Sequence, residues 1–203
     1  MPIQTHRIAV LAMQGDYQRH IDRLNELGAD AYPARLPDDI ATADGLVIPG
    51  GESTTIGKLI GRYGVDKAIL AAHADGKPIY GTCAGMIVLA KEIAEGTEES
   101  GGQAKLGILD ITVARNAFGR QIDSFECVLD APKITGDTGT PLTAVFIRAP
   151  IVTRVGNGVE VIAKHDDDIV FIRQGNVIAS SFHPELTDDT RVHQYFLSLL
   201  NER

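Results

Sequence analysis

The segment Lys77-Pro78-Ile79-Tyr80-Gly81-Thr82-Cys83-Ala84-Gly85-Met86-Ile87-Val88-Leu89 decides how this chain folds. It begins with a short apolar run, which predicts a buried strand. Two glycines, Gly81 and Gly85, then frame Cys83, and the apolar residues after them predict a helix. A strand, a sharp turn carrying a nucleophile and a helix follow one another in a nucleophile elbow, where glycines relieve the crowding of the turn.

Strand and helix patterns alternate upstream of this segment. Strands are expected at 8–13, 31–34 and 45–48, and helices at 17–27, from 53 onward and at 66–74. Ser53 or Thr54 is expected to cap the helix that begins there. This alternation predicts a mostly parallel sheet with helices on both faces.

The second half of the chain has a different pattern. Short β-rich runs separated by Gly, Pro, Asn and Asp lie at 106–114, 124–129, 143–147, 159–163, 169–173 and 177–181. They predict antiparallel strands added to the same domain, followed by an amphipathic helix at 189–200. The expected fold is therefore a single α/β domain over residues 1–203, a three-layer sandwich. Glu95–Gln103, rich in Glu and Gly, is expected to be a surface loop.

Composition limits the possible partners and compartments. The 203 residues are 44% apolar and 23% charged, typical of a globular chain, and the net charge of -8 argues against nucleic acid or an anionic membrane as partner. The apolar run near the start is too short for a signal peptide or a membrane span. We therefore expect a cytoplasmic protein, with Cys83 and Cys127 as free thiols.

Cys83 is the candidate nucleophile. A thiol attacks as its thiolate, and the start of a helix favours that negative charge. The backbone amide of Ala84, directly after the nucleophile, would stabilise an oxyanion. The alternative is that Cys83 is a small buried apolar residue, as most cysteines are.

His183 and Glu185 are the candidate partners of this thiol. In an extended segment, residues two apart project to one side, so the imidazole and the carboxylate can face the same cleft. The imidazole would accept the thiol proton, and the carboxylate would fix its tautomer. The alternative is a surface turn with an incidental histidine.

A third segment, Pro49-Gly50-Gly51-Glu52-Ser53, follows a predicted strand. Its glycines would expose backbone amides to an oxygen or anion, although an ordinary turn would look the same. A Walker phosphate loop is excluded because the Gly-Lys-Ser/Thr ending is absent. All three candidate segments follow predicted strands, and open α/β sheets bind ligands at the carboxyl ends of their strands.

These motifs resemble the class I (triad) glutamine amidotransferases and, more narrowly, the glutaminase subunits of pyridoxal phosphate synthases. The broad likeness rests on the three segments above. The narrower likeness rests on Ala12-Met13-Gln14-Gly15, Arg115-Asn116-Ala117-Phe118-Gly119-Arg120-Gln121-Ile122-Asp123-Ser124-Phe125-Glu126, Val145-Phe146-Ile147-Arg148-Ala149-Pro150 and Ser181-Phe182-His183-Pro184-Glu185-Leu186-Thr187. It spans nearly the whole chain, and Glu95–Gln103 is the clearest departure.

The resemblance implies hydrolysis of L-glutamine to L-glutamate and ammonia. Cys83 would form a γ-glutamyl thioester, His183 would transfer the protons, and Glu185 would orient His183. The amides of Gly51 and Ala84 would form the oxyanion hole. Carried over by motif, the residues that would hold glutamine are Gly51, Glu52, Ser53, Arg115, Ile147 and Arg148.

The resemblance also implies a partner. Ammonia would pass to a synthase subunit in a hetero-oligomer, and Gln14 lies in the segment that resembles the family's partner-responsive oxyanion region. Pyridoxal 5'-phosphate is then a product of the complex, and neither a cofactor nor a metal is implied. Two alternatives remain: an amidotransferase that serves another acceptor, such as imidazole glycerol phosphate synthesis, and a catalytically silent regulatory subunit.

The other histidines carry no metal-binding spacing. Surface or capping roles are expected for His6, His20, His73, His165 and His193. Asp166-Asp167-Asp168 is expected to form a charged hairpin tip, and Cys127 is expected to serve packing.

Overall fold

The computed structural model describes residues 5–94, 105–115, 117, 124–136 and 140–202, and the predicted α/β fold is confirmed within them. Its strands are β1 (Arg7–Leu11), β2 (Asp30–Ala34), β3 (Gly45–Ile48), β4 (Ile79–Thr82), β5 (Ala90–Ile93), β6 (Leu109–Ala114), β7 (Ser124–Leu129), β8 (Leu142–Ile147), β9 (Ile151–Val155), β10 (Val159–His165), β11 (Asp168–Gln174) and β12 (Val177–Ser180). The helices are α1 (Tyr17–Glu26), α2 (Pro37–Ala41), α3 (Ser53–Arg62), α4 (Val65–Ala74), α5 (Ala84–Leu89), α6 (Pro132–Thr135), α7 (Arg191–Ser198) and the 3₁₀ turns η2 (Pro184–Leu186) and η3 (Leu199–Asn201). The expected loop Glu95–Gln103 lies outside the described residues.

One large sheet organises the described chain. Its strand order is β2-β1-β3-β4-β12-β11-β9-β6-β5, with β10 paired to β11, while β7 and β8 form a separate antiparallel ribbon. The first five strands in this order run parallel to their neighbours. Antiparallel pairing begins between β12 and β11.

The position of β12 differs from the expectation for 177–181. That segment was expected among the added antiparallel strands, and it does pair antiparallel with β11. Its other edge pairs in parallel with β4, from Val177 opposite Ile79 to Ser180 opposite Thr82. All four residues of β12 are buried, because it lies in the middle of the sheet and is covered on both faces. Strands β5 and β9 were not predicted.

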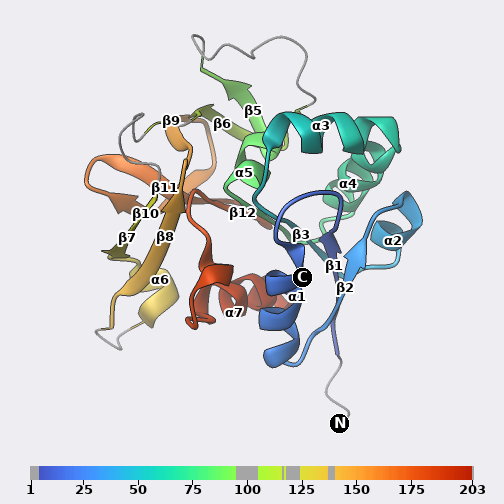
Figure 1. The fold of residues 1–203 in the computed structure, drawn as a ribbon, viewed down its shortest axis with the longest axis horizontal. Helices are drawn as coiled ribbons and strands as arrows, with labels where there is room; N and C mark the ends of the chain where they lie inside the picture. Colours follow the sequence, from blue (N-terminus) through green and yellow to red (C-terminus); the bar gives the residue numbers. More distant parts are fainter. Residues whose placement is uncertain (1–4, 95–104, 116, 118–123, 137–139, 203) are drawn as a thin grey trace.

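Alternating side chains send two apolar layers to opposite faces of the sheet. Ala9 and Leu11 belong to the core cluster that contains residues of α2, α3, α4 and α5, whereas Ile8 and Val10 belong to the cluster with residues of α1 and α7. The β7–β8 ribbon also packs in the second cluster. Figure 1 shows α3, α4 and α5 on one side of the sheet and α1 and α7 on the other. The predicted three-layer sandwich is confirmed.

The start of α3 corrects a second expectation. Glu52, rather than Ser53 or Thr54, is the N-cap residue, and its carboxylate accepts hydrogen bonds from the amides of Thr54 and Thr55. The positive end of the helix dipole also stabilises the negative charge of this carboxylate. No helix in the described part of the chain has the length and apolar character needed to cross a membrane.

Candidate active site

Three loops converge at the carboxyl ends of neighbouring parallel strands. Gly50 and Gly51 follow β3, Cys83 follows β4, and His183 lies just beyond β12. The strands are adjacent and in register, since Ile48 lies opposite Gly81 and Ser180 opposite Thr82. The parallel sheet therefore brings together residues that are far apart in the sequence, at the edge where such sheets bind ligands.

Cys83 occupies a strained turn between β4 and α5. Its φ of 48° and ψ of -103° are unusual for a residue with a side chain, and such strain is concentrated at functional sites. A Cβ at Gly85 would lie only 2.1 Å from the carbonyl oxygen of Ile48, so only glycine allows α5 to approach β3 this closely. This close approach explains the second glycine of the predicted nucleophile elbow.

The thiol and the imidazole meet beside Gly50. A Cβ at Gly50 would lie 2.4 Å from Cε1 of His183 and 3.4 Å from Cβ of Cys83, so both side chains occupy the space that this glycine leaves open. The position of His183 is fixed from β8, because its amide donates a 2.8 Å hydrogen bond to the carbonyl of Val145. Sγ of Cys83 lies 3.9 Å from the carbonyl oxygen of Ile147 on the same strand.

His183 and Glu185 form a buried ion pair behind the thiol. Nδ1 of His183 lies 2.7 Å from Oε1 of Glu185. Burial by itself would lower the pKa of His183, but interactions with Cys83 and Glu185 outweigh it and raise the pKa to about 10. Burial would raise the pKa of Glu185, but the neighbouring imidazoles of His20 and His183 lower it to about 2. The carboxylate is thus ionised at neutral pH and able to stabilise an imidazolium.

A pocket of about 280 Å³ lies over the thiol. It is lined by Gln14, Gly51, Glu52, Ser53, Cys83, Ala84, Ile87, Arg115, Ile147, Arg148 and His183. Every residue predicted to bind glutamine or to form the oxyanion hole is in this lining. Glu185 is not, because it lies behind His183 with 2% of its surface exposed.

Polar contacts organise one wall of this pocket. Oε1 of Gln14 accepts a 2.6 Å hydrogen bond from the amide of Glu52, which joins the loop after β1 to the loop after β3. The Arg115 guanidinium lies 3.6 Å from the Glu52 carboxylate. Burial would raise the pKa of Glu52, but hydrogen bonds from Thr55 and Thr54 lower it to about 2. A fixed negative charge therefore faces a guanidinium at the pocket rim.

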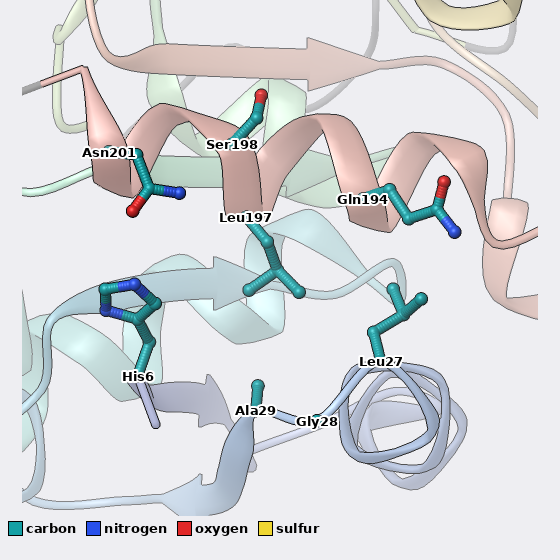
Figure 2. A pocket seen from close by; sticks show the side chains of 8 residues that line it. All are labelled: His6, Leu27, Gly28, Ala29, Gln194, Leu197, Ser198 and Asn201. Carbon is teal, nitrogen blue, oxygen red and sulfur yellow. The ribbon is translucent and has the colours of Figure 1, made fainter. Parts of the chain in front are cut away.

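A larger pocket of about 640 Å³ lies elsewhere. Figure 2 shows it between α7 and the chain that leaves α1, with Leu197 and Leu27 projecting into it. Its lining contains none of the predicted site residues. The smaller pocket is the candidate active site because it alone of the two is lined by the thiol and the imidazole.

Two histidines expected at the surface are fully buried instead. His20 and His193 are both 0% exposed, and Nδ1 of His20 lies 3.0 Å from Nε2 of His193. His20 also approaches Glu185, with Nε2 at 3.3 Å from Oε2. The sequence signal was available: Ile21 and Leu24 mark the inward face of α1, and His20 lies on that stripe.

Of the other histidines, His165 differs from the expectation, because it is half-buried with its ring 5.2 Å from that of Phe125. His6 pairs with Asp44 near the surface, and His73 is exposed. The turn between β10 and β11 carries Asp166 and Asp167, as expected for a hairpin tip. Both Cys83 and Cys127 are free, and Cys127 packs at the margin of a core cluster.

Solved structures define the class of this fold and pocket. A crystal structure of a glutamine amidotransferase superposes with a TM-score of 0.87 at 46% identity, covering 96% of this chain and 98% of that one. The glutaminase domain of a Trypanosoma brucei CTPS, solved with bound acivicin, superposes with a TM-score of 0.68 at 16% identity and shows the same fold. The fold is that of the glutamine amidotransferases.

The sequence narrows this class. Residues 10–202 match the SNO glutamine amidotransferase family, and the chain belongs to that family. It is 50% identical over 205 residues to a pyridoxal 5'-phosphate synthase subunit PdxT of Acidothermus cellulolyticus, covering 98% of this chain and 96% of the relative. It is 49% identical over 191 residues to the PdxT subunit of Carboxydothermus hydrogenoformans, covering 94% and 96%.

Proposed function

We propose that this protein is the glutaminase subunit of a pyridoxal 5'-phosphate synthase, which hydrolyses L-glutamine and supplies ammonia to a synthase subunit. The observation that carries the proposal is the convergence of the Cys83 thiol and the His183–Glu185 pair beside one pocket. Family membership and the PdxT relatives support the choice of substrate and partner.

The first half of the reaction would be attack by Cys83. Its Sγ would bond to the side-chain amide carbon of glutamine, and the carbonyl oxygen would become an oxyanion held by the amides of Gly51 and Ala84. His183, which carries the thiol proton, would transfer it to the leaving nitrogen. The C–N bond then breaks, which releases ammonia and leaves a γ-glutamyl thioester on the enzyme.

The second half would return the enzyme to its starting state. Water would lose a proton to His183 and attack the thioester carbon, and the C–S bond would break to give glutamate and the free thiol. Glu185 would orient the imidazole in both halves and stabilise its charged form. The charged residues at the rim suit an amino acid: Arg115 and Arg148 offer guanidinium groups to a carboxylate, and Glu52 offers a carboxylate to an ammonium group.

We further infer a cytoplasmic location and a hetero-oligomeric state with the synthase subunit. Two free thiols on an acidic chain suit a reducing compartment. A silent regulatory subunit is disfavoured because the imidazole of His183 contacts both the Cys83 thiol and the Glu185 carboxylate. An amidotransferase for imidazole glycerol phosphate synthesis is disfavoured because the curated relatives at about half identity are PdxT subunits.

The decisive experiment measures glutamate and ammonia release with and without the synthase subunit, for the parent and for Cys83→Ala. We expect glutamine hydrolysis that increases on adding the synthase, and a loss of about 10⁴-fold or more in the variant. The control is binding of Cys83→Ala to the synthase, which should be unchanged because one sulfur atom is removed at a pocket wall. Parental activity in the variant would overturn the assignment of the nucleophile.

A further inference from the structure

A line of contacts continues from the active site into the core. His183 contacts Oε1 of Glu185, and Oε2 of the same carboxylate lies 3.3 Å from Nε2 of His20 on α1. His20 in turn contacts His193 on α7, with 3.0 Å between Nδ1 and Nε2. Figure 1 shows α1 and α7 side by side under the same face of the sheet. The predicted triad therefore has two further imidazoles behind it, both fully buried.

The charge on Glu185 fixes the protons along this line. An ionised carboxylate only accepts hydrogen bonds, so Nε2 of His20 carries the proton and Nδ1 is left as an acceptor. His193 must then donate from Nε2, which leaves its Nδ1 as a bare lone pair. Among the described residues that Nδ1 has no hydrogen-bond partner. The opposite tautomers would set a lone pair against the carboxylate and bury an N–H without an acceptor, which is the costlier arrangement.

His20 faces Glu185 as a neutral imidazole. Burial lowers the pKa of His20, against the opposing charge of Glu185, so the ring is uncharged at neutral pH. The groups that face it are Thr82 and Tyr80 from β4, Asp16 before α1, Glu185 and His183 from the η2 segment, and His193 from α7. Oγ1 of Thr82 also lies 3.3 Å from Nε2.

A role in packing alone explains this arrangement poorly. Two imidazoles with no exposed surface cost desolvation that a pair of apolar side chains would avoid. Oε2 of Glu185 is buried and receives no regular hydrogen bond from the described residues, and Nε2 of His20 faces it at 3.3 Å. The terminal torsion of a glutamate is broad, and an unheld carboxylate would turn away from the imidazole that it orients.

We propose that His20 is a positioning residue of the active site: it holds Oε2 of Glu185 so that Oε1 faces Nδ1 of His183, and His193 fixes the His20 tautomer. This proposal rests on the proposed glutaminase chemistry, in which Glu185 orients the catalytic imidazole. It extends the triad to a second layer that touches no substrate. Outer partners of this kind orient metal-bound histidines in the same way.

The test compares two substitutions of similar size and polarity. The amide nitrogen of His20→Gln reaches the position of Nε2 and can still donate to Glu185, whereas that of His20→Asn reaches only the position of Nδ1. We expect His20→Asn to lower kcat of the synthase-bound enzyme about 10- to 100-fold with KM for glutamine changed less than threefold. His20→Gln should keep kcat within about threefold to fivefold of the parent, since it restores the donor.

A second readout does not depend on glutamine. The rate at which iodoacetamide alkylates Cys83 reports the thiolate that the His183–Glu185 pair sustains, and its pH profile should shift in His20→Asn but not in His20→Gln. Circular dichroism and synthase binding establish that each variant is folded. If folded His20→Asn matches the parent in both kcat and alkylation profile, or if His20→Gln is as impaired as His20→Asn, the positioning role is wrong.

The two proposals fail in different ways. If the parent protein is alkylated at Cys83 but hydrolyses no glutamine even with the synthase present, the proposed function is wrong. The alkylation profiles of the two variants would still decide whether His20 positions Glu185.

Discussion

The backbone amide of Cys83 donates a 2.7 Å hydrogen bond to the carbonyl of Ser180, at the point where β4 and β12 both end. This bond continues the parallel register of the two strands by one residue beyond Thr82. It joins the turn that carries the thiol to the segment that leads, three residues later, to the imidazole. The sheet therefore places the thiol beside the segment that carries the imidazole, and it is a rigid support for the proposed catalytic pair.

Replacing Glu185 by glutamine tests whether the negative charge of this side chain, rather than its size, is needed for the proposed activity. Glu185→Gln keeps the size of the side chain but removes the charge that stabilises an imidazolium, and its amide can hold His183 in the wrong tautomer. We expect kcat to fall about 10³- to 10⁴-fold with little change in KM. Steady-state glutaminase kinetics with the synthase present measure this. Glu185→Asp, which keeps the charge, should retain more activity than Glu185→Gln; the reverse order would contradict the role given to the charge.

The elbow glycine predicts a loss of stability that can be tested against a matched control. In Gly85→Ala the new methyl group would lie 2.1 Å from the carbonyl oxygen of Ile48, so α5 must move away from β3. We expect the free energy of unfolding to fall by about 2 kcal/mol or more. Gly61→Ala in α3 meets no atom within 4 Å and should instead raise it by about 0.5–1 kcal/mol. Urea denaturation distinguishes them, and equal effects would refute the crowding argument.

The buried histidines predict loss of stability in mild acid. Burial lowers the pKa of His193 to about 3, whereas the unfolded chain binds a proton near the ordinary value of 6.5. The stability that this neutral ring contributes is fully present above pH 6.5 and is lost as the pH falls toward 3. Between pH 7 and pH 5.5 the parent should lose about 1 kcal/mol more than His193→Gln, which cannot be protonated. Denaturant titrations at the two pH values measure the difference, and parallel losses would contradict it.

Gln14 is expected to control the segment that follows β3. Its Oε1 holds the amide of Glu52 at 2.6 Å, next to Gly51, whose own amide is proposed for the oxyanion hole. Gln14→Ala would release this segment, and we expect synthase-stimulated kcat to fall about 10-fold, the equivalent of one charge-neutral hydrogen bond. Gln18→Ala is the control, since Gln18 bonds to Asp22 on the exposed part of α1. If the synthase raises kcat of both variants as much as it raises kcat of the parent, Gln14 has no part in the stimulation.

Much of the fold could be predicted because local patterns decide it. The apolar runs at β1, β3 and β4 and the periodic helices α1 and α4 carry their signals within a few residues. The cap of α3 was misjudged because Ser53 and Thr54 are better caps on average, while the Glu52 side chain reaches the same amides in this turn. Strands β5 and β9 were missed because short runs without clear alternation depend on their neighbours in the sheet.

Part of the candidate site could also be predicted from the sequence, and part could not. All the lining residues except Ile87 could be predicted from their motifs, which lie at or just beyond the ends of strands. The contact between His20 and His193 could not, because the two rings meet only when α1 and α7 pack against one face of the sheet.

The sequence by itself determined the strand–turn–helix corner at Cys83, the alternation of strands and helices in the first half apart from α2 and β5, and the residue types available for amide hydrolysis. These follow from backbone preferences and periodicities that act over a few residues. Only the tertiary structure decided that β12 pairs in parallel with β4 and that His20 lies behind Glu185. Both depend on which distant segments pack against each other and bury their apolar surface. That is a property of the whole core rather than of any local stretch.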